Sequence, residues 1–148
     1  MTLSWGALPS DLDLHMSRPD GTGGRFHVFY LNTNPTPLVS QDVDDVNGDG
    51  PENTTVTVFA GAGGGFVAGR YHVWVHNFAG DAPFTESTAR LTLNGLVGQV
   101  LSVSEDDIVG DPTRRIWRAF EFDLSSAGTI SNVTPLQFFD DGTDVTVL

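Results

Sequence analysis

Cysteine and lysine are both missing from the 148 residues of this sequence. Without cysteine, the chain has no disulfide bond, no zinc–thiolate site and no cysteine nucleophile. Without lysine, its positive charge comes from seven arginines, against 19 Asp and Glu, for a formal net charge of −12 at pH 7. Nucleic acid and anionic membrane surfaces are therefore not expected as partners, and the self-repulsion of the chain favours bound cations.

Long hydrophobic runs are missing as well. No stretch approaches the ~20 apolar residues that span a bilayer, so we expect no membrane insertion. The opening letters MTLSWG have neither the basic nor the apolar region of a signal peptide. If the protein is extracellular, we expect it to be cut from a longer precursor. The length predicts a single domain, residues 1–148, with a real hydrophobic core.

Helical periodicity is also lacking. Between 17 Gly and 8 Pro, the apolar segments are short and alternate with a period of two. Strands are predicted at residues 11–16, 25–31, 55–59, 70–78, 89–93, 99–103, 116–122 and 129–133, with a further one at 143–148. The pattern predicts an all-β fold, an antiparallel β-sandwich of eight to nine short strands with long acidic and Gly-rich loops.

The densest group of charges is QDVDDVNGDGPEN at 41–53, in which five carboxylates share a turn-forming segment. Its letters DVNGDG at 45–50 match the opening of an EF-hand loop, but position 12 falls on Val56 and a strand-like segment follows. Crowded carboxylates repel one another unless water or a cation separates them, and oxygen ligands favour Ca²⁺. The alternative is a solvated acidic turn. The predicted calcium ligands in this segment are Asp42, Asp44, Asp45, Asn47, Asp49 and Glu52.

A second acidic pair, Asp11 and Asp13, lies in DLDLHM at 11–16. Alternation turns the Leu and Met side chains toward the core and places Asp11, Asp13 and His15 on the opposite face. Because Asp is disfavoured inside a strand, we expect Asp11 and Asp13 to bind the same cation as the acidic segment. The alternative is that Asp11 begins the strand and Asp13 is solvated.

Histidine and tryptophan share one face of the predicted strand RYHVWVHNF, at His72, Trp74 and His76. With His15 and His27 they are predicted to bind a peptide end or a sugar ring, unless Trp74 packs beneath a long loop. His72 and His76 lie ~13 Å apart on a strand, too far to share one zinc ion. His15, His27 and His76 could instead converge as a zinc site or serve as structural histidines.

Catalytic motifs are not found. The sequence has no G-x-S-x-G, and its paired carboxylates lie in loops with few apolar neighbours to raise a pKa. Its one basic cluster, Arg114, Arg115 and Arg118, is expected to neutralise neighbouring carboxylates, and the alternative is that it binds an anionic peptide terminus. We therefore expect a protein that is not an enzyme.

Five segments together resemble a known family: LSW at 3–5, DLDLHMSRPDG at 11–21, FHVFY at 26–30, DVDDVNGDGPE at 42–52 and GRYHVWVHNF at 69–78. In order and wording they are similar to the YfaP-type module, a domain of unknown function numbered 2135, over roughly residues 3–134. The resemblance implies an extracellular or periplasmic β-sandwich that recurs in large bacterial surface proteins, including adhesins. Residues 135–148 would be an extension or the start of the next module.

The resemblance and the acidic segment together imply a function. We expect a calcium-binding module of a secreted or cell-surface, adhesin-like bacterial protein, with Ca²⁺ as its cofactor, acting as a ligand-binding or spacer element. Its expected partners are a peptide or carbohydrate ligand and the neighbouring modules of a larger chain. The alternative is an enzyme-accessory domain of a secreted peptidase or hydrolase.

Overall fold

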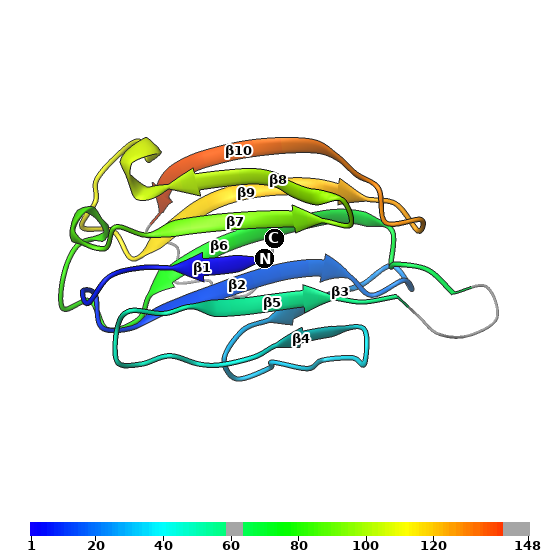
Figure 1. Ribbon diagram of the computed structural model, residues 1–148, viewed down its shortest axis with the longest axis horizontal. Helices are drawn as coiled ribbons and strands as arrows, with labels where there is room; N and C mark the ends of the chain where they lie inside the picture. The colour runs from blue at the N-terminus through cyan, green and yellow to red at the C-terminus, as the bar shows by residue number, and fades with distance from the viewer. Residues whose placement is uncertain (59–63, 141–148) are drawn as a thin grey trace.

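Two antiparallel sheets of five strands each pack face to face (Figure 1). The computed structural model describes residues 1–58 and 64–140. Sheet 1 has the strand order β4-β5-β1-β7-β8, and sheet 2 has the order β10-β9-β6-β2-β3. The predicted all-β antiparallel sandwich is confirmed, with ten strands in the described part of the chain rather than eight to nine.

The ten strands include a counterpart for each of the eight predicted between residues 11 and 133. Sheet 1 consists of β4 (Val39–Gln41), β5 (Glu52–Val56), β1 (Thr2–Ser4), β7 (Arg90–Gly95) and β8 (Gly98–Ser104). Sheet 2 consists of β10 (Ile130–Asp140), β9 (Ile116–Leu124), β6 (Gly69–Asn77), β2 (Leu12–Pro19) and β3 (Arg25–Val28). The short β1 and β4 have no predicted counterpart, and the strand predicted at 143–148 lies outside the described residues.

Two 3₁₀ helices lie in the connections, η1 (Phe84–Glu86) and η2 (Glu105–Asp107). In residues 1–58 and 64–140, no helix has the length and apolar character needed to cross a membrane. β10 continues to Asp140, where it still pairs with β9. Residues 135–140 thus belong to sheet 2. Their Pro135 is tolerated because β10 is an edge strand, where a missing N–H breaks no inner ladder.

The core lies between the two sheets. β2 turns Leu12, Leu14 and Met16 inward, as the alternation predicts, and all three are fully buried. From sheet 1 they are met by buried side chains that include Leu3 and Leu91. Each such side chain contributes roughly 1.5–3 kcal/mol of transfer free energy. This burial fixes which way β2 faces, and so places Asp11, Asp13 and His15 on the other side of sheet 2.

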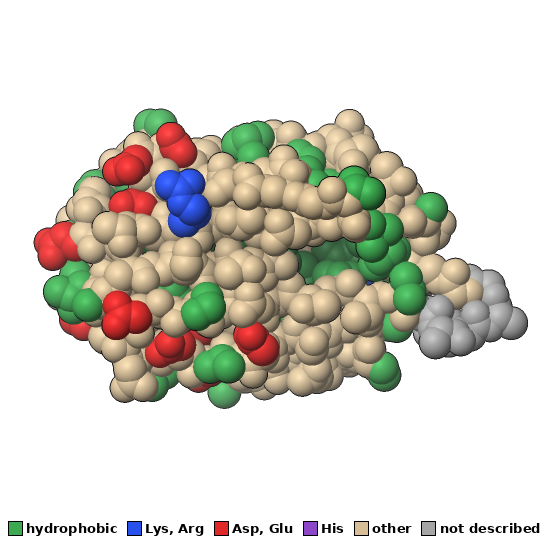
Figure 2. Space-filling model, viewed as in Figure 1, with side chains coloured by type: hydrophobic (Ala, Val, Ile, Leu, Met, Phe, Trp, Pro, Cys, Tyr) green, Lys and Arg blue, Asp and Glu red, His purple; other side chains and the backbone are tan. Residues whose placement is uncertain are grey.

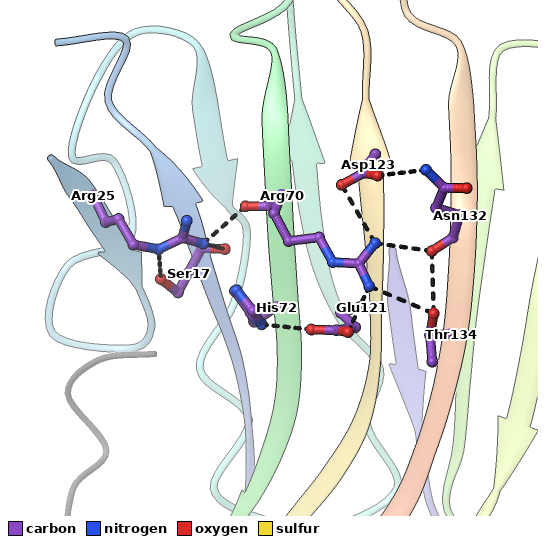
Figure 3. A network of polar contacts seen from close by, with 8 residues as sticks. All are labelled: Ser17, Arg25, Arg70, His72, Glu121, Asp123, Asn132 and Thr134. Atoms are coloured by element: carbon purple, nitrogen blue, oxygen red, sulfur yellow. Dashed lines mark hydrogen bonds and ion pairs between the residues drawn. The ribbon is translucent and has the colours of Figure 1, made fainter. Parts of the chain in front are cut away.

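The outer face of sheet 2 has polar contacts at one end. Figure 3 shows the residues of this polar ladder, which crosses five strands: Ser17, Arg25, Arg70, His72, Glu121, Asp123, Asn132 and Thr134. The Arg70 guanidinium pairs with the carboxylates of Glu121 and Asp123. A Glu121 oxygen also lies 3.1 Å from Nδ1 of His72. His72 is therefore engaged by a carboxylate of β9.

The outer face of sheet 1 differs between its two ends. Acidic side chains gather toward the left of Figure 2, the end at which Figure 1 places the loop between β4 and β5. Toward the right, an apolar hollow opens between the sheets, with a volume of about 220 Å³ and a lining that includes Phe66, Leu93 and Ile130. The hollow is thus remote from the acidic loop.

Gly50 lets the acidic loop, residues 42–51, pack against Trp5. Its φ is +50°, and a Cβ there would lie 2.8 Å from two ring carbons of Trp5. Gly23 has a φ of +100° with no atom within 4 Å of such a Cβ, so it is a matched control. We predict that Gly50→Ala lowers the free energy of unfolding, measured in urea, by about 1–3 kcal/mol more than Gly23→Ala. An equal loss of free energy of unfolding in the two variants would mean that the Trp5 ring moves aside to accommodate the added methyl group without loss of stability.

Candidate metal centre

The acidic loop closes over the first half of β2. β3 pairs only with the second half of β2, from Met16 to Pro19, so the edge before it is available to another partner. The N–H of Gly48 donates to the carbonyl of Ser10 at 2.7 Å, and the N–H of Asp49 donates to that of Gly6 at 2.9 Å. These hydrogen bonds anchor the loop to the segment that leads into β2.

Glu52 joins the loop to this edge from the first position of β5. Its side chain is fully buried, and Oε2 accepts hydrogen bonds from the N–H of Leu14 at 2.7 Å and from Nε2 of Gln41 at 3.1 Å. Oε1 accepts from the N–H of Asp45 at 3.3 Å. Burial raises the pKa of Glu52 to about 8; the hydrogen bond from Leu14 opposes the rise, and the charge of Asp13 adds to it.

Three carboxylates converge beside Glu52. One oxygen from each of Asp11, Asp13 and Asp44 lies within 4.8 Å of the other two. Asp13 is 1 % exposed and Asp11 9 %, while Asp44 on the loop is exposed. Burial raises the pKa of Asp11 to about 6, and the charges of Asp13 and Asp44 add to the rise. This arrangement is favourable only where a proton or a cation offsets the repulsion.

Two of these buried oxygens have no hydrogen-bond partner in the described structure, Oδ1 of Asp11 and Oδ2 of Asp13. A buried polar atom without a partner loses the free energy of hydration with nothing to replace it. Both atoms belong to residues of the carboxylate cluster, and unpartnered carboxylate oxygens are the donors that an oxygen-ligated cation requires.

Asp13 also belongs to a second donor group, with His15 and His76. The donor atoms of the three residues lie within 4.8 Å of one another. Oδ2 of Asp13 is 3.5 Å from Nδ1 of His76 and 3.9 Å from Nε2 of His15. Burial raises the pKa of Asp13, but the two imidazoles outweigh this effect and hold the pKa below its usual range. The group has one oxygen donor and two nitrogen donors.

Stacked rings cover this part of the outer face of sheet 2. His15, His27, Phe29 and Trp74 form an aromatic layer, with ring centroids 5.0 Å apart between His15 and His27 and 4.2 Å apart between His27 and Phe29. The Arg118 guanidinium lies 5.5 Å from the Trp74 ring centre, and its Nε and one terminal nitrogen donate hydrogen bonds to Oδ2 of Asp140, each at 3.1 Å. Trp74 is 1 % exposed. Its burial fits the packed alternative rather than an open surface.

The imidazoles of the aromatic layer are neutral at pH 7. Burial lowers the pKa of His15, and it lowers the pKa of His27 to about 4. Nδ1 of His15 lies 2.8 Å from Nε2 of His27, a hydrogen-bond distance. Of the three histidines considered for zinc, His15 and His76 thus lie beside Asp13, whereas His27 contacts the opposite ring nitrogen of His15.

The predicted calcium ligands separate into two sets. Asp11, Asp13 and Asp44 come together, as described above. Asp42 instead closes the base of the loop, because its oxygens accept from the N–H of Asn53 at 2.7 Å and from Nδ2 of Asn53 at 2.8 Å. Within the described residues, no three-carboxylate group includes the remaining predicted carboxylates, Asp42, Asp45, Asp49 and Glu52.

The EF-hand-like letters form a local turn. Oδ1 of Asp45 accepts from the N–H of Asn47 at 3.0 Å, and Asn47 and Asp49 are exposed.

The predicted ligand-binding residues also separate into two groups. His15, His27, Trp74 and His76 lie together, whereas His72 lies in the polar ladder. Sequence reasoning placed Asp13 and His15 on one strand face but assigned them to different sites, Asp13 to calcium and His15 to a ligand or a zinc ion.

Comparison with known proteins establishes only the fold. No family model matches the sequence. The structure is similar to a crystal structure of a protein of unknown function, SAV2460, with a TM-score of 0.64 and 16 % sequence identity over 95 % of this chain and 89 % of that one. At this identity the likeness concerns the β-sandwich alone. Membership of the YfaP-type family stays a prediction.

Proposed function

We propose that this chain is a calcium-binding β-sandwich module of a bacterial secreted or cell-surface protein. The observation that supports calcium is the buried carboxylate of Asp13, which has an unpartnered oxygen and lies against those of Asp11 and Asp44. Ca²⁺ takes 6–8 oxygen ligands, so backbone carbonyls and water would complete its coordination. The ion would neutralise charge that this acidic chain concentrates at one point.

Calcium would act here as a structural link. Asp13 lies at the start of β2 in sheet 2 and Asp11 directly precedes that strand, whereas Asp44 is on the loop between two strands of sheet 1. An ion held by both would join the edges of the two sheets, and its binding free energy would add to folding stability. Extracellular modules bind calcium with Kd values of ~10⁻⁴–10⁻³ M, which suits a calcium-rich exterior.

The burial of the rings supports a spacer role over a ligand-binding one. Trp74 and His15 are not accessible enough to stack on a sugar or a peptide end. The resemblance to the YfaP-type module supports an adhesin-like parent protein at the bacterial surface. In such a chain, a calcium-stiffened sandwich would hold neighbouring modules apart.

Thermal unfolding in EDTA and in calcium tests the proposal. At ten times the Kd, calcium adds about 1.4 kcal/mol of stability, and we predict a rise in Tm of about 3–6 °C for a domain of this size. Magnesium is expected to give a smaller rise, because it demands a rigid octahedral shell. Coincident melting curves in EDTA and calcium would refute the calcium site.

Two variants of the loop locate the ion. Asp44→Asn removes one carboxylate of the cluster and is expected to abolish the calcium-induced rise in Tm. Asp49→Asn removes the same charge from the same loop, at an exposed residue outside the cluster, and should keep the rise. The reverse result would place calcium in the EF-hand-like turn instead.

A further inference from the structure

A buried imidazole nitrogen lies near a buried carboxylate on the outer face of sheet 2. His15 is 0 % exposed, and within the described residues its Nε2 has no hydrogen-bond partner, nor has Oδ2 of Asp13, 3.9 Å away. Nδ1 of His76 lies 3.5 Å from the same oxygen. We propose that Asp13, His15 and His76 bind a divalent transition-metal ion of the Zn²⁺ type.

The hydrogen bond between His15 and His27 prepares His15 as a ligand. If Nδ1 of His15 donates its proton to Nε2 of His27, 2.8 Å away, then Nε2 of His15 presents a lone pair toward Asp13. Metal-bound histidines commonly donate their other ring N–H to such a partner, which fixes the tautomer and the ring orientation. The neighbouring rings of Phe29 and Trp74 hold both imidazoles in place.

Strand register brings the three ligands together. Asp13 and His76 are direct partners across β2 and β6, and His15 is two residues along from Asp13 on the same face. A tetrahedral ion with ~2.0–2.1 Å bonds separates its ligand atoms by about 3.3 Å. The observed 3.5 and 3.9 Å are close to that value, and the donor atoms of the third pair, His15 and His76, lie within 4.8 Å of each other.

The donor set selects the class of ion. Two imidazoles suit zinc, copper, iron and nickel, whereas calcium and magnesium prefer oxygen alone. Three protein ligands leave at least one coordination position for water or an exogenous ligand. The side chain of His76 is 19 % exposed, so solvent reaches this side of the group. The site shares Asp13 with the calcium cluster, but its two histidines select a different class of ion.

Metal titration of the chelator-treated chain tests this site. We expect one equivalent of Co²⁺ to give the visible absorption of a four- or five-coordinate complex, and Zn²⁺ to displace it. In ¹⁵N NMR, Nε2 of His15 should shift on zinc binding, whereas a purely structural histidine would not respond. His76→Gln should weaken zinc binding by more than about 100-fold, because it removes a direct ligand.

Matched variants separate this site from its surroundings. His72→Gln, on the same strand but paired with Glu121, should leave zinc affinity unchanged. His27→Phe keeps a ring in the stack but removes the acceptor for His15, and should cost about 10–100-fold. Asp44→Asn should lose the calcium response yet bind zinc normally. Absence of a Co²⁺ spectrum, or equal zinc affinity in wild type and His76→Gln, would overturn the proposal.

Discussion

Glu52→Gln is expected to prevent the loss of stability that the metal-free wild-type protein undergoes as the pH rises from 6.5 to 8. The pKa of Glu52 is raised from 4.5 to about 8 in the folded chain. The folded state therefore holds a proton that the unfolded state has released. The stabilising contribution is complete below pH 4.5 and is mostly lost by about pH 8, and about 2 kcal/mol of it is lost between pH 6.5 and pH 8.

The pH window isolates Glu52 from its neighbours. Asp11, with a pKa raised to about 6, makes its contribution between pH 3.8 and 6. His27, with a pKa lowered to about 4, acts in the opposite sense, between pH 4 and 6.5. The pKa of the Met1 amine is lowered by burial, so its effect overlaps the window. Comparison of wild type with Glu52→Gln cancels that effect, since both proteins have the same amine.

Urea unfolding in EDTA at pH 6.5 and pH 8 measures the effect. The stability of Glu52→Gln relative to wild type should increase by about 2 kcal/mol across this range. Glu86→Gln removes the same charge from an exposed position and should follow wild type. Saturating calcium should make the free energy of unfolding of the wild-type protein less dependent on pH, because a nearby cation favours the ionised carboxylate of Glu52. Parallel behaviour of wild type and Glu52→Gln would mean that Glu52 is already ionised at pH 6.5.

The strands that alternation predicts are those long enough to show a period. β2 and β6 each bury one apolar face, so their patterns are legible in the sequence. β1 and β4 have three residues each, too few to show alternation. Their place depends on partners far along the chain: Leu3 of β1 pairs with Leu91 and with Glu52. Such pairings follow from the packed structure, not from local sequence.

The sequence predicted individual ligand residues at β2, but on the loop it predicted six candidates without singling out Asp44. An Asp pair within a strand signals a functional reason in the sequence itself, because Asp is unfavourable there. Which loop carboxylate reaches that pair depends on the loop backbone, whose Gly48 packs against Ala7, where a Cβ would lie 2.7 Å from the carbonyl oxygen. The EF-hand-like letters favoured Asp45 and Asp49, but Asp44 is the residue that lies beside Asp11 and Asp13.

The group of one carboxylate and two imidazoles, Asp13, His15 and His76, is harder still to predict, because it depends on the register between β2 and β6. Asp13 and His76 are 63 positions apart in the sequence and become direct neighbours only when β2 pairs with β6. A shift of one residue would turn His76 to the core side of the sheet. The buried Leu14 and Val75, which are also direct partners, fix the register from the core. Hydrophobic packing on one face thus positions the ligands on the other.

Trp74→Ala should lower the free energy of unfolding by about 3–5 kcal/mol, as expected when a large buried aromatic is removed. Trp74 is 1 % exposed, and its ring stacks on His15 at 5.4 Å and on His27 at 5.1 Å. Loss of the ring would admit water to the aromatic layer. The pKa of His27 should then rise from about 4 toward its ordinary 6.5, because burial is the main cause of its depression.

Urea unfolding and NMR titration of the histidines measure both effects. Trp117→Ala is the control, because Trp117 is fully buried in the core between the sheets. It should cost a similar free energy yet leave the pKa of His27 unchanged. If Trp74→Ala costs less than about 1 kcal/mol, the rings are not a packed layer and are available to a ligand, as the strand pattern alone predicts. If it costs the full amount, the rings are a structural layer that covers His15 and His27 and holds His15 beside Asp13.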